Sequence, residues 1–108
     1  MPHYLTQVAY TSECWAALLQ KPQNRIEAVR PAIEKLGGKI ESAHLSFGEY
    51  DFVVILETPD SVSAAAISMA FGAGGACKSI KTTPLLTPDE GVEAMNKAAK
   101  SGYKPATG

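Results

Sequence analysis

The densest group of chemically capable side chains is the segment Gly48-Glu49-Tyr50-Asp51, with His44 shortly before it. A phenol beside a carboxylate can donate a hydrogen bond to a developing oxyanion, and a histidine can act as a base near neutral pH. Tyr50, Asp51 and His44 are therefore the candidate catalytic residues. We favour the structural alternative, in which Gly48 shapes a turn, Asp51 accepts backbone hydrogen bonds and Tyr50 packs on a sheet edge. Glu49 is expected to be exposed.

Such a turn needs strands on both sides to hold it. Residues 39–47 and 51–57 are extended candidates, and the interval between them is of hairpin length and contains glycine, which predicts antiparallel pairing. Residues 3–10 alternate polar and apolar side chains and predict another strand. A last extended run over residues 77–83 reaches Pro84, which marks a strand end or an edge strand.

Helices are predicted between these strands. A short helix follows the capping residue Thr11 and ends before Pro22, and residues 26–36 keep helical apolar spacing until Gly37 closes the segment. Residues 62–73 form the next helix. The order of elements predicts an α+β, ferredoxin-like split βαβ fold, in which a four-stranded antiparallel sheet carries its helices on one face.

The composition changes beyond Leu86, which we take as the boundary between a domain of residues 1–86 and a C-terminal segment of residues 87–108. Thr87 and Glu90 have the spacing of a capping box, which predicts a helix from residue 88 to about residue 100. The remaining residues, 101–108, have the composition of a flexible tail.

The strand over residues 51–57 contains five consecutive apolar residues, Phe52 to Leu56. Because neighbouring residues of a strand point to opposite faces, both faces of the sheet are apolar here. Helices would cover one face only. We therefore expect a homodimer or higher homo-oligomer in which a second copy covers the other face, and consider folding of the C-terminal helix underneath the less favoured alternative.

Charge and hydropathy exclude several partners. The 108 residues contain ten Lys and Arg against eleven Asp and Glu, and no basic run could neutralise a row of phosphates, so we expect no nucleic acid partner. No apolar stretch approaches the roughly 20 residues that cross a bilayer, and the N-terminus lacks the pattern of a signal peptide. We expect a cytoplasmic protein with no membrane partner.

No cofactor or metal is predicted. His3 and His44 could join Glu49 or Asp51 around an ion, but the strands that carry the two histidines should be separated by a third, so we expect solvent-facing or packed histidines. The glycines near residues 72–75 follow a helix and do not match a dinucleotide loop. Cys14 and Cys77 lack any CxxC pattern and are expected to be small buried apolar residues.

Taken together, several segments resemble the GYD domain family, which is named for its Gly-x-Tyr-Asp signature. These segments are an aromatic near Tyr4, residues 34–39, residues 48–57 and the Pro59-Asp60 start of an alanine-rich helix. The resemblance covers about residues 4–86. It implies a ferredoxin-like domain of the dimeric α/β barrel type in a small bacterial protein, and it supplies no established reaction. The resemblance implies that Gly48, Tyr50 and Asp51 are the residues of this chain that correspond to the family signature.

Three functions remain open. The first is a homo-oligomeric module that binds a small organic molecule or anion in the cleft between sheet and helices, near Tyr10, Trp15, His44 and Tyr50. The second is a cofactor-free isomerase or monooxygenase acting on an activated carbon acid, with His44 or Asp51 as base and Tyr50 as oxyanion donor. The third is a structural or partner-binding assembly unit that docks through its C-terminal helix.

Overall fold

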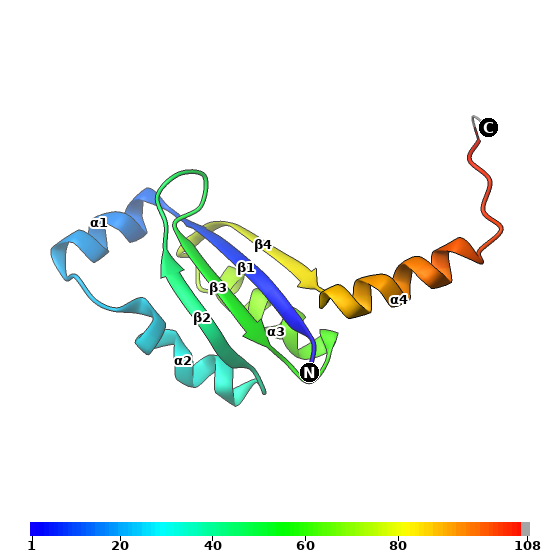
Figure 1. Ribbon diagram of the computed structural model, residues 1–108. Coiled ribbons are helices and arrows are strands. Elements are labelled where there is room, and N and C mark those ends of the chain that lie inside the picture. Colours follow the sequence, from blue (N-terminus) through cyan, green and yellow to red (C-terminus); the bar gives the residue numbers. More distant parts are fainter. Residues whose placement is uncertain (107–108) are drawn as a thin grey trace.

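The computed structural model describes residues 1–106, so the last two residues of the expected tail lie outside the described part of the chain. The elements follow the order strand, two helices, two strands, helix, strand, helix (Figure 1). Their bounds are β1 His3–Tyr10, α1 Ser12–Gln20, α2 Arg25–Lys35, β2 Lys39–Leu45, β3 Phe52–Glu57, α3 Ser61–Ala73, β4 Cys77–Leu85 and α4 Pro88–Ala99.

The four strands form one antiparallel sheet in the order β2-β3-β1-β4. Leu5 in the middle of β1 lies opposite Ile55 of β3 on one side and Thr83 of β4 on the other. This topology confirms the predicted ferredoxin-like α+β fold and the separation of β1 from β2 by β3. The hairpin of β2 and β3 is antiparallel, as predicted, although β2 ends at Leu45, two residues earlier than expected.

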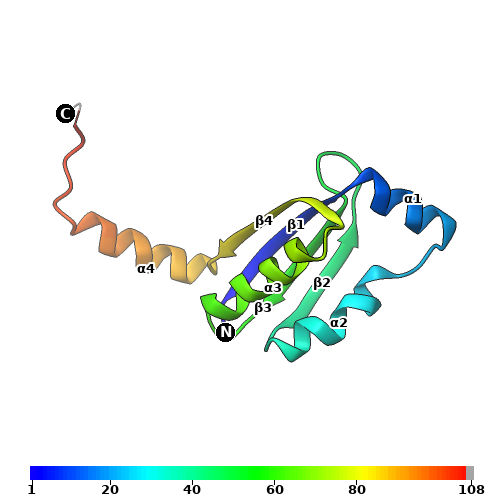
Figure 2. The same cartoon turned by 180° about the vertical axis from the view of Figure 1, so that it is seen from behind.

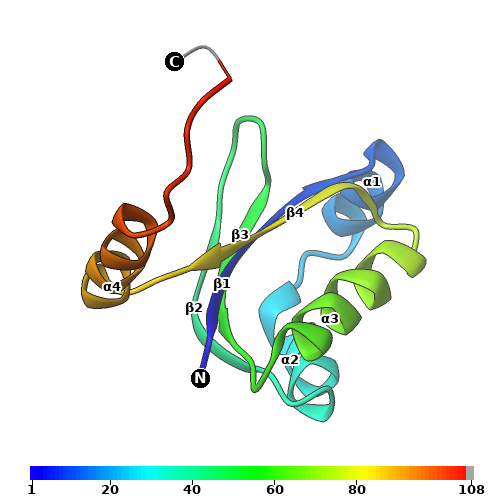
Figure 3. The ribbon, with the colours of Figure 1, turned by 90° about the vertical axis from the view of Figure 1, so that its right-hand side faces the viewer.

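Helices α1, α2 and α3 lie on one side of the sheet, and Figures 2 and 3 show that α4 does not join them. Along β3 and the first six residues of β1, the residues that point toward the helices are buried, whereas the residues between them are half-buried. The last three residues of β1 are all buried. Val8, Val54 and Leu56 pack there against Ile33 of α2 and Ile67 of α3. This hydrophobic core fixes the helices over the sheet and so shapes the cleft between them.

The connection from α2 to β2 depends on two glycines. Gly37 has a φ of +88° and ends α2, as the sequence predicts, because a left-handed residue lets the last carbonyl groups of the helix find donors. The Gly38 N–H accordingly donates to the Ile33 carbonyl at 2.9 Å. A Cβ atom at Gly38 would lie 2.9 Å from side-chain atoms of both Ile33 and Ile67, so only glycine fits where the two helices meet the sheet.

The face of the sheet opposite α1, α2 and α3 is open in this chain. We call it the open face, and its central apolar residues are Leu5, Val53, Ile55 and Leu85, all half-buried. The alternation of buried and half-buried residues along β3 confirms that both sides of this strand are apolar.

Helix α4 begins with the predicted capping box, in which the Glu90 N–H donates to Thr87 Oγ1 at 3.1 Å and the Thr87 N–H to Glu90 Oε1 at 2.9 Å. The helix projects from the end of β4 on the side of the open face (Figure 3), and Val92 and Met95 remain 54% and 70% exposed. Within residues 1–106, no helix is long and apolar enough to span a membrane.

Candidate functional site

The turn that carries the Gly-x-Tyr-Asp signature is closed by two hydrogen bonds within it and joined to the sheet by a third. The Ser46 N–H donates to the Asp51 carbonyl at 2.8 Å, and the Ser46 hydroxyl donates to the Tyr50 carbonyl at 2.7 Å. The Asp51 N–H then donates to the carbonyl of Val8 in β1 at 2.8 Å. The turn is therefore held against the end of β1, where that strand gives way to α1.

The side chain of Asp51 extends this attachment. Its Oδ2 accepts the Tyr10 N–H at 2.9 Å and the indole Nε1–H of Trp15 at 3.3 Å. The Trp15 ring in turn packs edge-on against Tyr10, with 5.5 Å between ring centroids. A carboxylate that accepts two N–H donors orders the groups around it, because charge-assisted hydrogen bonds are stronger than neutral ones. Asp51 thus positions the first turns of α1, which form one wall of the cleft.

Two adjoining pockets occupy the cleft between the sheet and the helices. The first, which we call the α3 pocket, has a volume of about 350 Å³ and is closed on one side by Phe71 of α3. The second, the β2 pocket, has a volume of about 430 Å³ and reaches His44 of β2 and Trp15 of α1. Both are also lined by the same five residues, Tyr10, Leu18, Gln23, Arg25 and Phe52.

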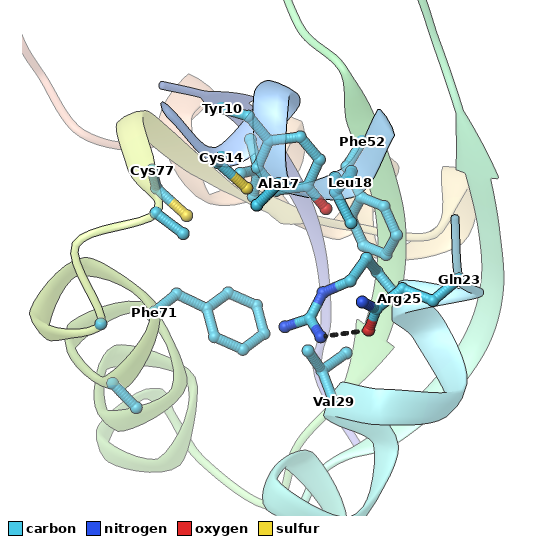
Figure 4. A pocket seen from close by; sticks show the side chains of 14 residues that line it. Tyr10, Cys14, Ala17, Leu18, Gln23, Arg25, Val29, Phe52, Phe71 and Cys77 are labelled. Atoms are coloured by element: carbon cyan, nitrogen blue, oxygen red, sulfur yellow. Dashed lines mark hydrogen bonds between the residues drawn. The ribbon is translucent and has the colours of Figure 1, made fainter. Parts of the chain in front are cut away.

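Arg25 is the cationic side chain at the boundary of the two pockets. It is the first residue of α2, directly after the N-cap Asn24, whose Oδ1 accepts the Ile26 N–H at 3.0 Å. The guanidinium donates to Gln23 Oε1 at 3.0 Å, as Figure 4 shows, and forms no ion pair within residues 1–106. Its positive charge consequently remains unneutralised beside apolar walls.

Tyr10 supplies a second polar group at this boundary. The residue is only 8% exposed, and its hydroxyl makes no hydrogen bond to another described residue. Burial raises the pKa of Tyr10, the nearby Cys14 thiol raises it further, and Arg25 acts in the opposite direction. The phenol therefore stays protonated at neutral pH and can donate a hydrogen bond into the cleft.

Both cysteines line the α3 pocket with their thiols free. Cys14 and Cys77 pack against the hydrophobic core but are half-buried, so they are less buried than the sequence predicts. Figure 4 shows their sulfur atoms at the same end of the pocket. Burial, followed by the influence of Cys14, raises the pKa of the Cys77 thiol. Cys77 is accordingly held in its neutral form.

The predicted ligand-binding residues are brought together in part. Tyr10, Trp15 and His44 line the β2 pocket, whereas Tyr50 is half-buried in the turn and lines neither pocket. Of the candidate catalytic residues, Asp51 is engaged by Tyr10 and Trp15, and His44 is exposed on β2 opposite Val53. No hydrogen bond joins His44, Tyr50 and Asp51 within residues 1–106.

The turn residues Gly48 and Glu49 are exposed. The sequence predicts this exposure for Glu49.

His3 has different neighbours from those considered in the sequence. Its Nε2 lies 2.9 Å from Glu57 Oε1 and 3.1 Å from Glu41 Oε2, where it forms ion pairs when protonated. One ligand atom from each residue lies within 4.8 Å of the others, so the three could hold a metal ion. The register of β1 and β3 places His3 opposite Glu57. Glu41 lies between Ile40 and Ser42, where the pairing of β2 with β3 shifts register.

Arg25 is the functional candidate that the sequence does not reveal. An arginine at the start of a helix usually lies in solvent, and no motif surrounds this one. Arg25 becomes a candidate because it lines a pocket together with Phe52 and Phe71. These three residues are far apart in the sequence and come together only in the folded chain.

A four-stranded antiparallel sheet with its packed helices on one face defines a ferredoxin-like α+β protein. The model of the GYD domain matches residues 4–95, and the chain belongs to this family. A solved structure described as "crystal structure of FFRP-DM1" is similar at 16% identity with a TM-score of 0.49, covering 80% of this chain and 100% of that one. A comparison with curated proteins gave no match.

Proposed function

We propose that this chain binds a small organic molecule or anion in the cleft formed by the α3 and β2 pockets. The observation that carries the proposal is the pair of adjoining cavities with largely apolar walls and a few polar groups, among them Arg25 and Tyr10. Their volumes fall within the range of about 300 to 1,000 Å³ that is typical of small-molecule sites.

Catalysis on an activated carbon acid is the weaker candidate. It would need a base and an oxyanion donor facing the same substrate atom. His44 borders the β2 pocket, but its pairing with Val53 places its side chain on the open face. Tyr50 lines neither cavity, and the Asp51 carboxylate already accepts two N–H groups. Binding therefore accounts for more of the geometry than a reaction does.

The proposal includes self-association through the open face. Leu5, Val53 and Ile55 present a half-buried apolar centre there, and an isologous contact with a second copy would remove it from water. Helix α4 supports the same arrangement, because a capped helix of 12 residues with exposed Val92 and Met95 gains little stability on its own. A role for α4 in docking another protein is the alternative to this arrangement.

Binding can be tested by screening metabolites with Trp15 fluorescence and thermal shift, since Trp15 lines the β2 pocket. Compounds that occupy the cleft should raise the melting temperature of the wild type. Ala70→Phe, which places a ring at the wall of the α3 pocket, should weaken the thermal-shift response to compounds that occupy this pocket, whereas Ala65→Phe on the exposed side of the same helix should keep it. A screen with no response in the wild type contradicts the proposal.

A further inference from the structure

The α3 pocket contains a cation without a counter-charge. A guanidinium carries five N–H donors, and Arg25 commits one hydrogen bond to Gln23. No Asp or Glu lines either pocket, and Arg25 is the only Lys or Arg among the lining residues of both. Because a half-buried charge beside apolar walls is costly without a partner, the site electrostatically favours an anion.

Tyr10 offers a second donor to the same region. Its ring comes from β1 and Arg25 from α2, and Figure 4 shows the hydroxyl directed toward the side of the pocket that Arg25 occupies. The hydroxyl has no hydrogen-bond partner among residues 1–106 and is not fully buried. A phenol and a guanidinium that converge in this way can share the oxygens of one planar anion.

The rest of the α3 pocket is apolar. Val8 and Phe52 come from the sheet, Val29 from α2 and Phe71 from α3, and Figure 4 shows the Arg25 side chain reaching between Phe71 and Val29. Aromatic and aliphatic walls of this kind gain free energy by covering an apolar body. An inorganic anion has no apolar body that could cover these walls.

We propose that the α3 pocket binds an organic carboxylate, whose charged group is held by Arg25 and Tyr10 and whose apolar body packs against Phe52 and Phe71. The inference rests on the proposed small-molecule function and names its ligand class. A carboxylate fits better than a phosphate ester because one guanidinium balances one negative charge, and a second charge would remain uncompensated beside the apolar walls.

Acids and their primary amides are the matched probes, because the two have nearly the same size and differ in charge. Titration calorimetry would compare hexanoate with hexanamide and phenylacetate with phenylacetamide. The wild type should bind the better acid at least about tenfold more tightly than its amide, as expected for a charge-assisted hydrogen-bonded pair. Tyr10→Phe should weaken binding of the acid several-fold and leave the amide less affected.

The decisive variant is Arg25→Met, which should bring the acid to the affinity of its amide. Arg30→Met is the matched control: it removes one positive charge from the same helix at a residue that is paired with Glu27 at 3.2 Å and lies outside both pockets. Its affinity for the acid should equal that of the wild type. Arg25→Lys keeps the positive charge but lacks the planar guanidinium, so its affinity for the acid should lie between that of the wild type and that of Arg25→Met.

The outcomes separate the two proposals. If the wild type binds acid and amide equally, carboxylate recognition is overturned, whereas the proposal of small-molecule binding stands. The same conclusion follows if inorganic phosphate binds more tightly than every acid. Equal loss in Arg25→Met and Arg30→Met assigns the effect to net charge and also overturns the inference. If no acid, amide or metabolite binds, both proposals fail. The acid and amide comparison in the wild type holds even if Arg25→Met does not fold.

Discussion

Asp51 and Trp15 lie 36 residues apart in the chain and are joined by a hydrogen bond from the indole Nε1–H to Oδ2 at 3.3 Å. The same oxygen accepts the Tyr10 N–H at 2.9 Å. The aspartate of the Gly-x-Tyr-Asp signature thus fastens the β2–β3 turn to the junction of β1 and α1. In this chain the signature residue acts on the cleft between the sheet and the helices through the walls that it positions.

Asp51→Ala should lower the free energy of unfolding by about 1 to 3 kcal/mol, because two partly buried N–H groups lose their acceptor. Trp15→Phe removes one of these hydrogen bonds and keeps a ring against Tyr10, so it should lower the free energy of unfolding by less than Asp51→Ala does. Urea denaturation measures both. Glu49→Gln, on the same turn and exposed, should stay within about 0.5 kcal/mol of the wild type. If Asp51→Ala is as stable as Glu49→Gln, the anchoring role is wrong.

Gly38→Ala should destabilise the fold by about 1 to 3 kcal/mol, because the added methyl group would lie 2.9 Å from both Ile33 and Ile67. Gly72→Ala makes the same chemical change inside α3, where the nearest atom is 3.9 Å away in Ile80. That variant should be stabilised by about 0.5 to 1 kcal/mol, since alanine favours helix. Thermal and urea unfolding of the two variants should therefore move in opposite directions.

The two glycine positions also show what a sequence can predict. Gly37 follows a helical apolar pattern, so its left-handed conformation at the end of α2 is readable from local spacing. The need for glycine at Gly38 arises from Ile67, which is distant in sequence and reaches this position only through tertiary packing. The same distinction separates the GYD turn, a local motif, from Arg25, whose pocket is assembled from β1, β3, β4 and three helices.

Strand pairing explains the neighbours of His3, which the sequence does not reveal. The sequence offers His44 and the turn carboxylates as conceivable neighbours of His3, but the β1–β3 register sets His3 opposite Glu57. Register depends on the pairing of whole strands, and that is fixed only when the hairpin of β2 and β3 is placed beside β1. The order of the strands is predictable from the sequence, whereas the partners of one half-buried side chain at the strand end are not.

Asp60 should contribute a pH-dependent part of the stability. It caps α3 by accepting the Ser63 N–H at 2.8 Å, and this backbone hydrogen bond holds the pKa of Asp60 below its ordinary value of 3.8. A lowered folded-state pKa stabilises the fold above the unfolded value, and the contribution is lost as the pH falls through the folded-state pKa. Asp60→Asn keeps a capping oxygen without titrating, so acid denaturation should show a smaller loss of stability below the ordinary pKa.

Glu90 provides a comparison for the acid titration. The Thr87 N–H lowers the pKa of Glu90 in the α4 capping box, but α4 projects from the domain. Acidification through the folded-state pKa should therefore reduce the helix content of α4, and Glu90→Gln should leave global unfolding unchanged. Far-ultraviolet circular dichroism and urea unfolding at several pH values distinguish the two effects. A change in global stability equal to that of Asp60→Asn would contradict the separation of α4.

Cys77 should react slowly with iodoacetamide at neutral pH, because burial raises the pKa of its thiol above the ordinary value of 9.0 and the thiolate is the nucleophile. In a Cys14→Ser variant, alkylation of Cys77 followed by mass spectrometry should be slower in the folded protein than in urea. The rate should still be rising at pH 9. A folded-state rate equal to the rate in urea would show that the thiol is not shielded.

Ile55→Lys should convert the proposed oligomer into a monomer at micromolar concentration, because it places a charge in the centre of the open face. Ala65→Lys, on the exposed side of α3, is the control and should leave the mass in light scattering unchanged. Deletion of residues after Leu86 should weaken association while the core melts as before. A monodisperse wild-type monomer would contradict self-association through this face.

The edge strand β4 limits how copies of this chain can join. Sheets extend into fibres when the exposed backbone of an edge strand accepts another strand, and Pro84, within β4, has no N–H to offer one. Lys78 and Lys81 are exposed along the same strand and add charge that repels an incoming copy. Growth by strand addition is therefore disfavoured at the β4 edge of the sheet, whereas a second copy that stacked on the open face through an isologous contact would give an assembly of defined size.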